Sequence, residues 1–213
     1  MRKKDNLAVD KILECAKEEF MEKGFIEASM RTIAEKAGYT TGMVYGRFAD
    51  KSQLFKELVE EGATKLFNYY SDVQNEFASF PPEQQREQMH TYVDDKMDKL
   101  IDIMYEYIDA FKLIVSKSAG TGYEYYIDNM IAIETTNTER FIRKINEAGF
   151  ETNEVRADLS HMLASALFNG VFEVVSHDFP KEDARVYIKQ LQDFFNAGWD
   201  RLLGLPSDWK NSI

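Results

Sequence analysis

The chain has 213 residues, of which 44% are hydrophobic and 30% are charged, as is typical of a globular protein. A single cysteine excludes an intrachain disulfide, and no secretory signal or membrane-length apolar run is evident, so we expect a cytoplasmic protein without membrane contact. The net charge is −11, yet residues 1–56 hold 11 basic and 9 acidic side chains, a net of +2, whereas the remainder carries −13. This polarity favours a basic face that approaches phosphate while the acidic remainder is repelled.

The first part of the chain is predicted to form short helices. Apolar residues recur at helical spacing over about 6–23, and Gly24 follows as a residue that commonly ends a helix. Ser29 is placed to cap a second helix over 30–37. Ile33, Ala34 and Ala37 form one apolar face of this second helix.

A helix-turn-helix unit is predicted next. Gly38 supplies a tight turn, and Thr40 or Thr41 caps a second short helix whose Val44 and Phe48 point inward. Two helices joined by a short turn with glycine form the DNA-binding supersecondary unit, whose second helix enters the major groove.

The rest of the chain is predicted to be helical as well. Asp50 and Gln53 resemble a capping box that opens a long helix over 51–77. Further helices are expected over 83–118 with a break near 99–104, over 123–148, over 154–177 with Asn153 as cap, and from a break at 178–180 to about 203. We therefore predict an all-α protein of about nine helices: a helix-turn-helix DNA-binding domain at 1–50 and a helical ligand-sensing and dimerisation domain at 51–213, connected by helix 51–77.

The last two predicted helices look apolar over more than one face. Gly170 and Gly198 would let neighbouring helices approach closely. We expect two subunits to pair through this helix pair, although burial of both stripes in the monomer core is the alternative. The candidate interface residues are Leu163, Leu167, Val171, Val174, Leu191, Phe194 and Phe195.

Residues 10–60 resemble a known family of DNA-binding proteins. The resemblance rests on Ile12, Ala16, Phe20, Gly24, Thr32-Ile33-Ala34, Ala37-Gly38, Gly42, Val44-Tyr45, Phe48, Lys51 and Leu54. In this order and density, they resemble the tetracycline-repressor (TetR/AcrR-like) family of transcriptional regulators. The remainder of the chain resembles that family only in helix count, helix spacing and the terminal helix pair.

The resemblance implies a set of DNA contacts. It assigns Arg31, Thr32, Tyr45, Arg47 and Lys51 to phosphates, and Thr40, Thr41, Gly42 and Met43 to base edges. This recognition helix lacks the arginine, asparagine or glutamine that reads bases through two hydrogen bonds. We therefore expect specificity to rest on thymine methyl groups, phosphate positioning and DNA shape.

The resemblance also implies a regulator, expected to be a repressor, that binds a palindromic operator as a homodimer. A small molecule bound in the C-terminal helices would release it. Aromatic and sulfur side chains predict an apolar or aromatic effector, and acidic residues near them leave a cationic one open. The candidate ligand contacts, for which a place in the core is the alternative, are Met104, Tyr105, Phe111, Tyr123, Tyr126, Met130 and Phe168.

Two other functions remain open from the sequence. One is a DNA-binding regulator without a small-molecule ligand. The other, more remote, is a di-metal helical-bundle enzyme, for which Glu87-x-x-His90 and Asp158-x-x-His161 supply an incomplete set of ligands. No catalytic triad spacing, P-loop or dinucleotide fingerprint is present, so we expect no enzyme activity, no cofactor and no metal.

Overall fold

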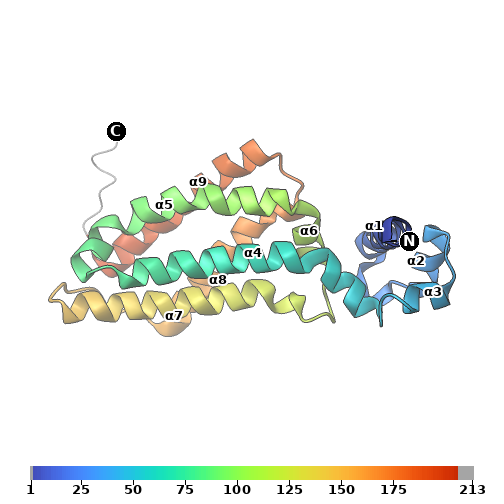
Figure 1. Ribbon diagram of the computed structural model, residues 1–213. Coiled ribbons are helices and arrows are strands. Elements are labelled where there is room, and N and C mark those ends of the chain that lie inside the picture. Colours follow the sequence, from blue (N-terminus) through green and yellow to red (C-terminus); the bar gives the residue numbers. More distant parts are fainter. Residues whose placement is uncertain (1, 206–213) are drawn as a thin grey trace. The chain divides into compact units, whose positions relative to one another are not determined.

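The computed structural model describes residues 2–205, with side chains from residue 7 onward except that of residue 95. These residues form nine α-helices and one short 3-10 helix without any strand, which confirms the all-α prediction (Figure 1). The helices are α1 (Arg2–Glu27), α2 (Met30–Ala37), α3 (Thr41–Tyr45), α4 (Lys51–Ser79), α5 (Pro82–Glu106), α6 (Ile108–Lys117), η1 (Tyr123–Tyr125), α7 (Tyr126–Glu147), α8 (Ala157–Ser176) and α9 (Lys181–Leu203).

The helices group into two compact units that differ from the predicted domains. Residues 2–65 and 106–126 form the head unit, and residues 66–105 and 127–205 form the body unit. The sequence predicts a boundary near residue 50. Helix α4 runs without interruption through residues 51–79, so no break in the helix marks the boundary between the two units. Helix α6 joins the head because it packs on α1, where Lys17 Nζ lies 2.6 Å from Asp109 Oδ2.

Three aromatic rings form the centre of the head unit. Phe20 and Phe55 are fully buried, and Phe25 lies against both with ring centroids 5.9 and 5.6 Å away. Burial of each ring stabilises the fold by roughly 1.5–3 kcal/mol. The predicted helix end at Gly24 is a kink instead: its φ of 75° interrupts α1, which then continues to Glu27.

The helix starts follow the predicted caps only in part. Ser29 precedes α2 in an extended conformation, but its side chain makes no capping hydrogen bond. At the start of α4, Asp50 Oδ1 accepts from the backbone N–H of Gln53 at 2.9 Å, and Gln53 Oε1 accepts from the N–H of Ala49 at 2.8 Å. The predicted capping box is therefore present, with its return bond shifted by one residue.

The break in the predicted helix 83–118 occurs at Tyr107 and not at 99–104. Tyr107 leaves the helical region with φ −116° and ψ 35°, and its hydroxyl donates to Glu61 at 2.7 Å. It lies directly over Gly62, where an added Cβ atom would come within 2.6 Å of the Tyr107 Cβ. This break is caused by packing against α4, and no proline or glycine marks it in the sequence.

The body unit is held together by contacts between its helices. Tyr70 of α4 donates its hydroxyl to Glu134 of α7 at 2.6 Å, and Lys189 of α9 lies 2.9 Å from Asp94 of α5. Asn153 does not cap α8, because residues 151–156 are not helical. Its backbone N–H instead donates to the carbonyl of Leu203 at 2.9 Å, which ties the segment before α8 to the end of α9.

Helices α8 and α9 approach closely where the sequence predicted it. At Gly170 an added Cβ atom would meet a Leu191 methyl group at 2.9 Å, whereas no described atom lies within 4 Å of the same position at Gly198. By length and composition α8 could cross a membrane, contrary to the sequence expectation that no such stretch exists. Core helices of globular proteins share this composition, and Phe172, Val174 and other residues of α8 are buried here.

Candidate functional site

The turn between α2 and α3 is built around Gly38. This residue has φ 77° and ψ 26°, a left-handed conformation that glycine adopts without strain. Its N–H donates to the carbonyl of Glu35 at 3.1 Å, and the N–H of Tyr39 donates to that of Ala34 at 2.9 Å. These two bonds close the end of α2 and confirm the predicted tight turn.

Helix α3 is fixed by one cap and two buried side chains. Thr40 Oγ1 accepts from the backbone N–H of Met43 at 3.2 Å, as expected for a capping threonine. Val44 is fully buried and Phe48 is 4% exposed, so both point inward as predicted. The opposite face of α3 is thereby directed outward.

The outward face carries the residues assigned to DNA. Thr40, Gly42 and Tyr45 are exposed, and Tyr45 presents 51% of its surface. The remaining three, Thr41, Met43 and Arg47, are partly exposed. The structure therefore brings together, around one short helix, all six residues that the sequence assigned to this region.

Two further assigned residues lie at the start of α2. Arg31 has an 81% exposed side chain, and its Nε lies 2.9 Å from Glu35 Oε1 one turn later. Such exposed pairs contribute little to stability, so the guanidinium is readily redirected to a phosphate. Thr32 is partly exposed beside it.

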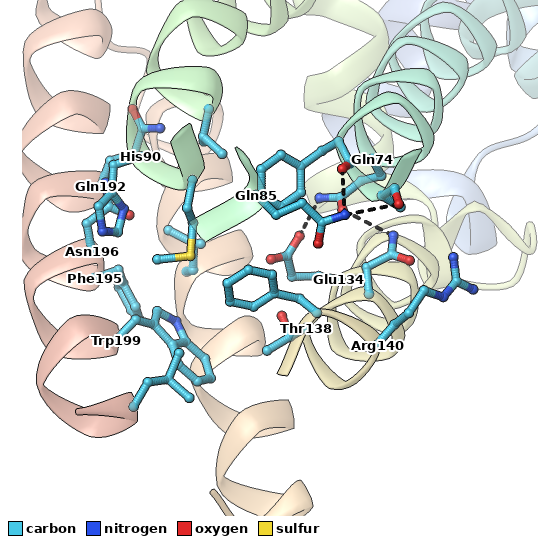
Figure 2. Close-up of a pocket in the computed structure, with 18 of the residues that line it drawn as sticks. Gln74, Gln85, His90, Glu134, Thr138, Arg140, Gln192, Phe195, Asn196 and Trp199 are labelled. Carbon is cyan, nitrogen blue, oxygen red and sulfur yellow. Dashed lines mark hydrogen bonds between the residues drawn. The ribbon is translucent and has the colours of Figure 1, made fainter. Parts of the chain in front are cut away.

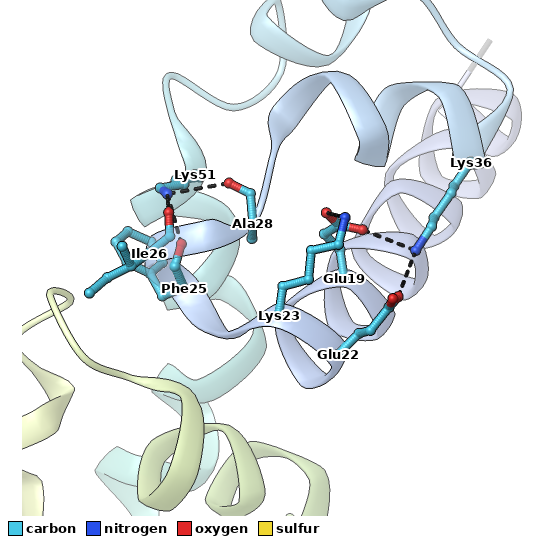
Figure 3. Close-up of polar contacts among 8 residues, drawn as sticks. All are labelled: Glu19, Glu22, Lys23, Phe25, Ile26, Ala28, Lys36 and Lys51. Atoms are coloured by element: carbon cyan, nitrogen blue, oxygen red, sulfur yellow. Dashed lines mark hydrogen bonds and ion pairs between the residues drawn. The ribbon is translucent and has the colours of Figure 1, made fainter.

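Lys51, which the sequence assigned to a phosphate, makes contacts within the head unit. Its Nζ donates to the carbonyls of Phe25 and Ile26 at 2.7 Å each and to that of Ala28 at 3.3 Å (Figure 3). An ammonium group has three N–H donors, and all three are engaged here. The ammonium also lies 4.7 Å from the centre of the Phe25 ring. Lys51 therefore closes the end of α1.

Beneath the helix-turn-helix lies a buried carboxylate that sequence reasoning missed. The Glu19 side chain is fully buried and lies 2.9 Å from Lys23 Nζ and 3.0 Å from Lys36 Nζ (Figure 3). Burial by itself would raise the pKa of Glu19, but the hydrogen bonds from the two lysines together lower it. The available signal was a glutamate three residues after Ala16 on the apolar face of α1.

The body unit contains a cavity of about 170 Å³ that no sequence pattern indicated (Figure 2). Its wall comes from α4, α5, α7, α8 and α9, and ten of the 20 lining residues are polar, among them Arg140 and Lys144. The apolar lining consists of Phe77, Ala78, Met89, Val93, Met97, Phe141, Leu167, Phe195, Trp199 and Leu203. An apolar cavity of about 150 Å³ accommodates benzene, so the volume of this cavity is sufficient for a single ring.

Glu134 is the one carboxylate among the described residues that line this cavity. Its Oε2 accepts from the Tyr70 hydroxyl at 2.6 Å and from Gln74 Nε2 at 2.7 Å, and both donors are uncharged. Burial raises the pKa of Glu134, and the two hydrogen bonds only partly oppose this effect. Among the described side chains no lysine or arginine forms an ion pair with Glu134, although Arg140 and Lys144 line the same cavity.

Two further polar groups at the cavity, Gln85 and His90, are already engaged. Gln85 is 1% exposed and donates its amide to the carbonyls of Phe77, Ala78 and Phe80 at 3.0 Å each, which closes the end of α4. His90 Nε2 lies 2.8 Å from Asp200 Oδ1. Within the described part of the chain, no three His, Cys, Asp or Glu side chains are grouped to hold a metal ion.

None of the seven residues proposed from the sequence as ligand contacts lines this cavity. Met104, Phe111 and Met130 are at most 1% exposed, and Tyr126 donates its hydroxyl to the Ala63 carbonyl at 2.9 Å. The others make similar internal contacts: Tyr105 donates to the carbonyl of Phe179, Tyr123 packs on Phe55, and Phe168 packs on Tyr70. The alternative reading, in which these stripes form the core, therefore describes them better.

The proposed interface residues divide into two groups. Val171 and Val174 are 5% and 0% exposed within the single chain, which favours the alternative that they belong to the monomer core. Phe194 is 72% exposed. Leu163, Leu167, Leu191 and Phe195 are half-buried.

A helix-turn-helix whose second helix faces outward is the arrangement by which proteins read the major groove of DNA. Comparison with known proteins agrees. Residues 12–58 match the family of bacterial regulatory proteins known as the tetR family. The chain is 25% identical over 192 residues to the HTH-type transcriptional regulator AcrR of Shigella flexneri, covering 86% of this chain and 87% of that protein.

Solved structures share the fold. A TetR family transcriptional regulator from Chloroflexus aurantiacus has a TM-score of 0.58 at 15% identity, covering 91% of this chain and 93% of its own. NalD, the secondary repressor of the MexAB-OprM multidrug efflux pump in Pseudomonas aeruginosa, has a TM-score of 0.53 at 18% identity, with coverages of 89% and 95%. The chain is therefore similar to TetR/AcrR-like transcriptional regulators, over residues 12–58 in sequence and over most of its length in fold.

Proposed function

We propose that the protein is a homodimeric, ligand-responsive repressor that binds a palindromic operator and is released by a small organic effector. The observation that carries this proposal is the cavity of about 170 Å³ with an unpaired carboxylate in the body of a DNA-reading chain. A dimer with two-fold symmetry reads two half-sites, which accounts for the palindrome. We place the protein in the cytoplasm, where its DNA lies.

The DNA contacts of this proposal are those that the outward face of α3 supports. Thr40, Thr41, Gly42 and Met43 meet base edges, while Tyr45 and Arg47 meet phosphates. Arg31 and Thr32 add backbone contacts from the start of α2. Residues 1–56 carry a net charge of +2 in a chain of −11, which directs the head toward the duplex.

The subunits pair, in this proposal, through the exposed face of α8 and α9. Phe194 is 72% exposed, Met162 67% and Val186 60%, which is unusual for large apolar side chains. Phe194 and Gly198 lie one turn apart on α9, and open space surrounds the glycine in the single chain. A second copy of this face supplies the apolar surface that both helices lack.

The effector is an organic cation with a single aromatic ring. Its ring occupies the aromatic wall formed by Phe77, Phe141 and Trp199, and its ammonium group pairs with Glu134. A buried carboxylate without a cation is unfavourable, so a ligand that supplies the positive charge gains binding energy there. Phe195 and Leu167 line the same cavity and belong to the proposed interface helices.

Helix α4 provides a route from the cavity to the head. Gln74, Phe77 and Ala78 line the cavity near the C-terminal end of α4, and Lys51 at its first residue holds the end of α1. An effector shifts the equilibrium only if it binds one state of the dimer more tightly than the other. We infer that the occupied cavity favours a position of α4 that misaligns the two recognition helices.

The test uses fluorescently labelled DNA from immediately upstream of the protein's own gene. Phe194→Glu should yield a monomer in sedimentation and lose operator binding, while the exposed control Leu7→Glu should remain a dimer. Addition of 4-ethylphenethylamine should release the wild-type protein from DNA but not Glu134→Gln. A reporter fused to that promoter should rise when the amine is added. Operator binding that no organic amine reduces would favour the regulator without a ligand.

A further inference from the structure

The amide of Gln192 is a polar group without a partner at the wall of the cavity. Gln192 lies on α9, is 4% exposed and lines the cavity (Figure 2). Its Nε2 is buried and donates to no acceptor among the described residues. More than nine in ten buried polar groups in proteins are hydrogen-bonded, so this donor requires an explanation.

Two carboxylate oxygens of the body unit already have partners. Asp200 Oδ1 lies 2.8 Å from His90 Nε2, and Glu134 Oε2 already accepts two hydrogen bonds. Ile188, one turn before Gln192 on α9, is fully buried, which holds this stretch of the helix in place. The donor is therefore left over after the internal contacts of the body unit have formed.

An unsatisfied buried donor destabilises the empty protein, and such departures from good packing are concentrated at functional sites. The loss is recovered when a ligand supplies the missing acceptor. A site built in this way discriminates strongly, because a ligand that lacks the acceptor leaves the donor unpaired again.

We propose that Gln192 is a specificity-determining residue that donates a hydrogen bond to an ether, carbonyl or hydroxyl oxygen of the effector. This inference rests on the proposed function, since it assumes that the cavity holds the effector. It extends that function by naming a second recognition point. The effector then carries three features: a cationic amine for Glu134, one aromatic ring, and an oxygen acceptor for Gln192.

A matched pair of probes isolates the acceptor. The two amines 4-methoxyphenethylamine and 4-ethylphenethylamine have the same charge, ring and length, and differ by an oxygen in place of a methylene group. Calorimetric titration of the full-length wild-type dimer should show binding at least about tenfold tighter for the methoxy compound. Linkers of one to three methylene groups are compared for both, so that the best-fitting length is used.

Substitution of Gln192 should remove the preference. In Gln192→Leu the two amines should bind within about twofold of each other. Met97→Ala, which alters the apolar wall, and Glu134→Gln, which removes the charge, should weaken both amines alike and keep the preference. These controls separate recognition of the acceptor from general damage to the cavity.

A second readout needs no ligand. Gln192→Leu should raise the melting temperature of the empty protein by about 2–4 °C, because it removes an unpaired buried donor without creating a cavity. A fall in melting temperature would mean that the amide has a structural role, and the proposal would be wrong.

The outcomes also distinguish this inference from the proposed function. Equal binding of both amines at every linker length, or a preference that survives in Gln192→Leu, overturns the role of Gln192 and leaves the regulator intact. If neither amine binds, the proposed role of Gln192 is also overturned. The expected preference without any release from DNA supports Gln192 as a recognition residue and contradicts only the coupling to DNA.

Discussion

The ammonium nitrogen of Lys51 lies 2.7 Å from the carbonyl oxygen of Ile26, so the first residue of α4 closes the last turn of α1. A cation at the C-terminal end of a helix interacts favourably with the helix dipole and with its unpaired carbonyls. This contact joins the helix that leads to the cavity with the helix that supports the DNA-reading head. These contacts predict a role for Lys51 in the stability of the head unit, and its contact with a phosphate stays a prediction to be tested.

Replacement of Lys51 by methionine should therefore destabilise the head. Loss of three charge-assisted hydrogen bonds to carbonyls should lower the free energy of unfolding by about 1.5–3 kcal/mol. Urea unfolding followed by circular dichroism measures this change. Lys56→Met, which removes an exposed pair with Glu60, should change stability by less than about 1 kcal/mol.

The same variant also tests the DNA contact. Where Lys51 does not bind phosphate, the slope of log affinity against log salt should be the same in Lys51→Met and wild type. A slope that falls by about one unit would show a phosphate contact and contradict the structural role.

Glu19 should make the stability of the head depend on pH. Its pKa is lowered in the folded state by Lys23 and Lys36 against the opposing effect of burial. The stabilisation is therefore present above the ordinary value of 4.5 and is lost as the pH falls through the lower folded value. Glu19→Gln should lower the free energy of unfolding by about 3 kcal/mol at pH 7. In urea unfolding, the variant should also lose less stability than the wild type between pH 7 and pH 3. An equal loss of stability in variant and wild type over this pH range would rule out the Glu19 ion pairs as the cause of the pH dependence.

Tyr45 and Thr41 should affect DNA binding in different ways. Tyr45→Phe removes one hydrogen bond to the backbone, so affinity should drop about fivefold for every sequence while stability stays unchanged. Thr41→Ala should alter which operator variants are preferred, because its methyl and hydroxyl groups face base edges. Anisotropy titrations on the operator, single-base variants and random DNA compare the two. A uniform loss in Thr41→Ala would mean that α3 does not read bases.

Glu134 should link amine binding to pH in the opposite sense to Glu19. Because burial raises its folded pKa above 4.5, its contribution to stability is complete below that value and is lost as the pH rises through the folded pKa. A cationic amine binds the ionised form, so its affinity should increase with pH between 5 and 8, where the amine stays protonated. Proton release, measured as buffer-dependent binding enthalpy, should accompany binding at the lower end of this range. Glu134→Gln should abolish both effects.

Local chemistry made the DNA-reading part predictable. Gly38 indicates a left-handed turn, Thr40 caps α3, and the spacing of Val44 and Phe48 identifies the buried face of α3. Each of these features depends on residues within a few positions of one another. The same holds for Gly170, whose missing side chain admits Leu191.

The remaining features depend on contacts between distant segments. The cap that Lys51 places on α1 spans 25 residues of sequence, and the break at Tyr107 depends on its approach to Gly62. Aromatic and sulfur-containing residues at helical spacing line a core and a cavity equally well, so the sequence pattern of Met130 and Phe111 fits a ligand site although both are buried. Gln192 looks like any polar residue in an amphipathic helix until its missing partner is seen.

The most direct test of the account is an anisotropy titration of the purified protein against DNA from upstream of its own gene. Random DNA is the control, several salt concentrations are used, and 4-methoxyphenethylamine is added at saturation. The account predicts saturable, salt-dependent binding of two subunits per site, a clear preference over random DNA, and release on addition of the amine. Equal weak binding to both DNAs at low salt, unaffected by the amine, would contradict it.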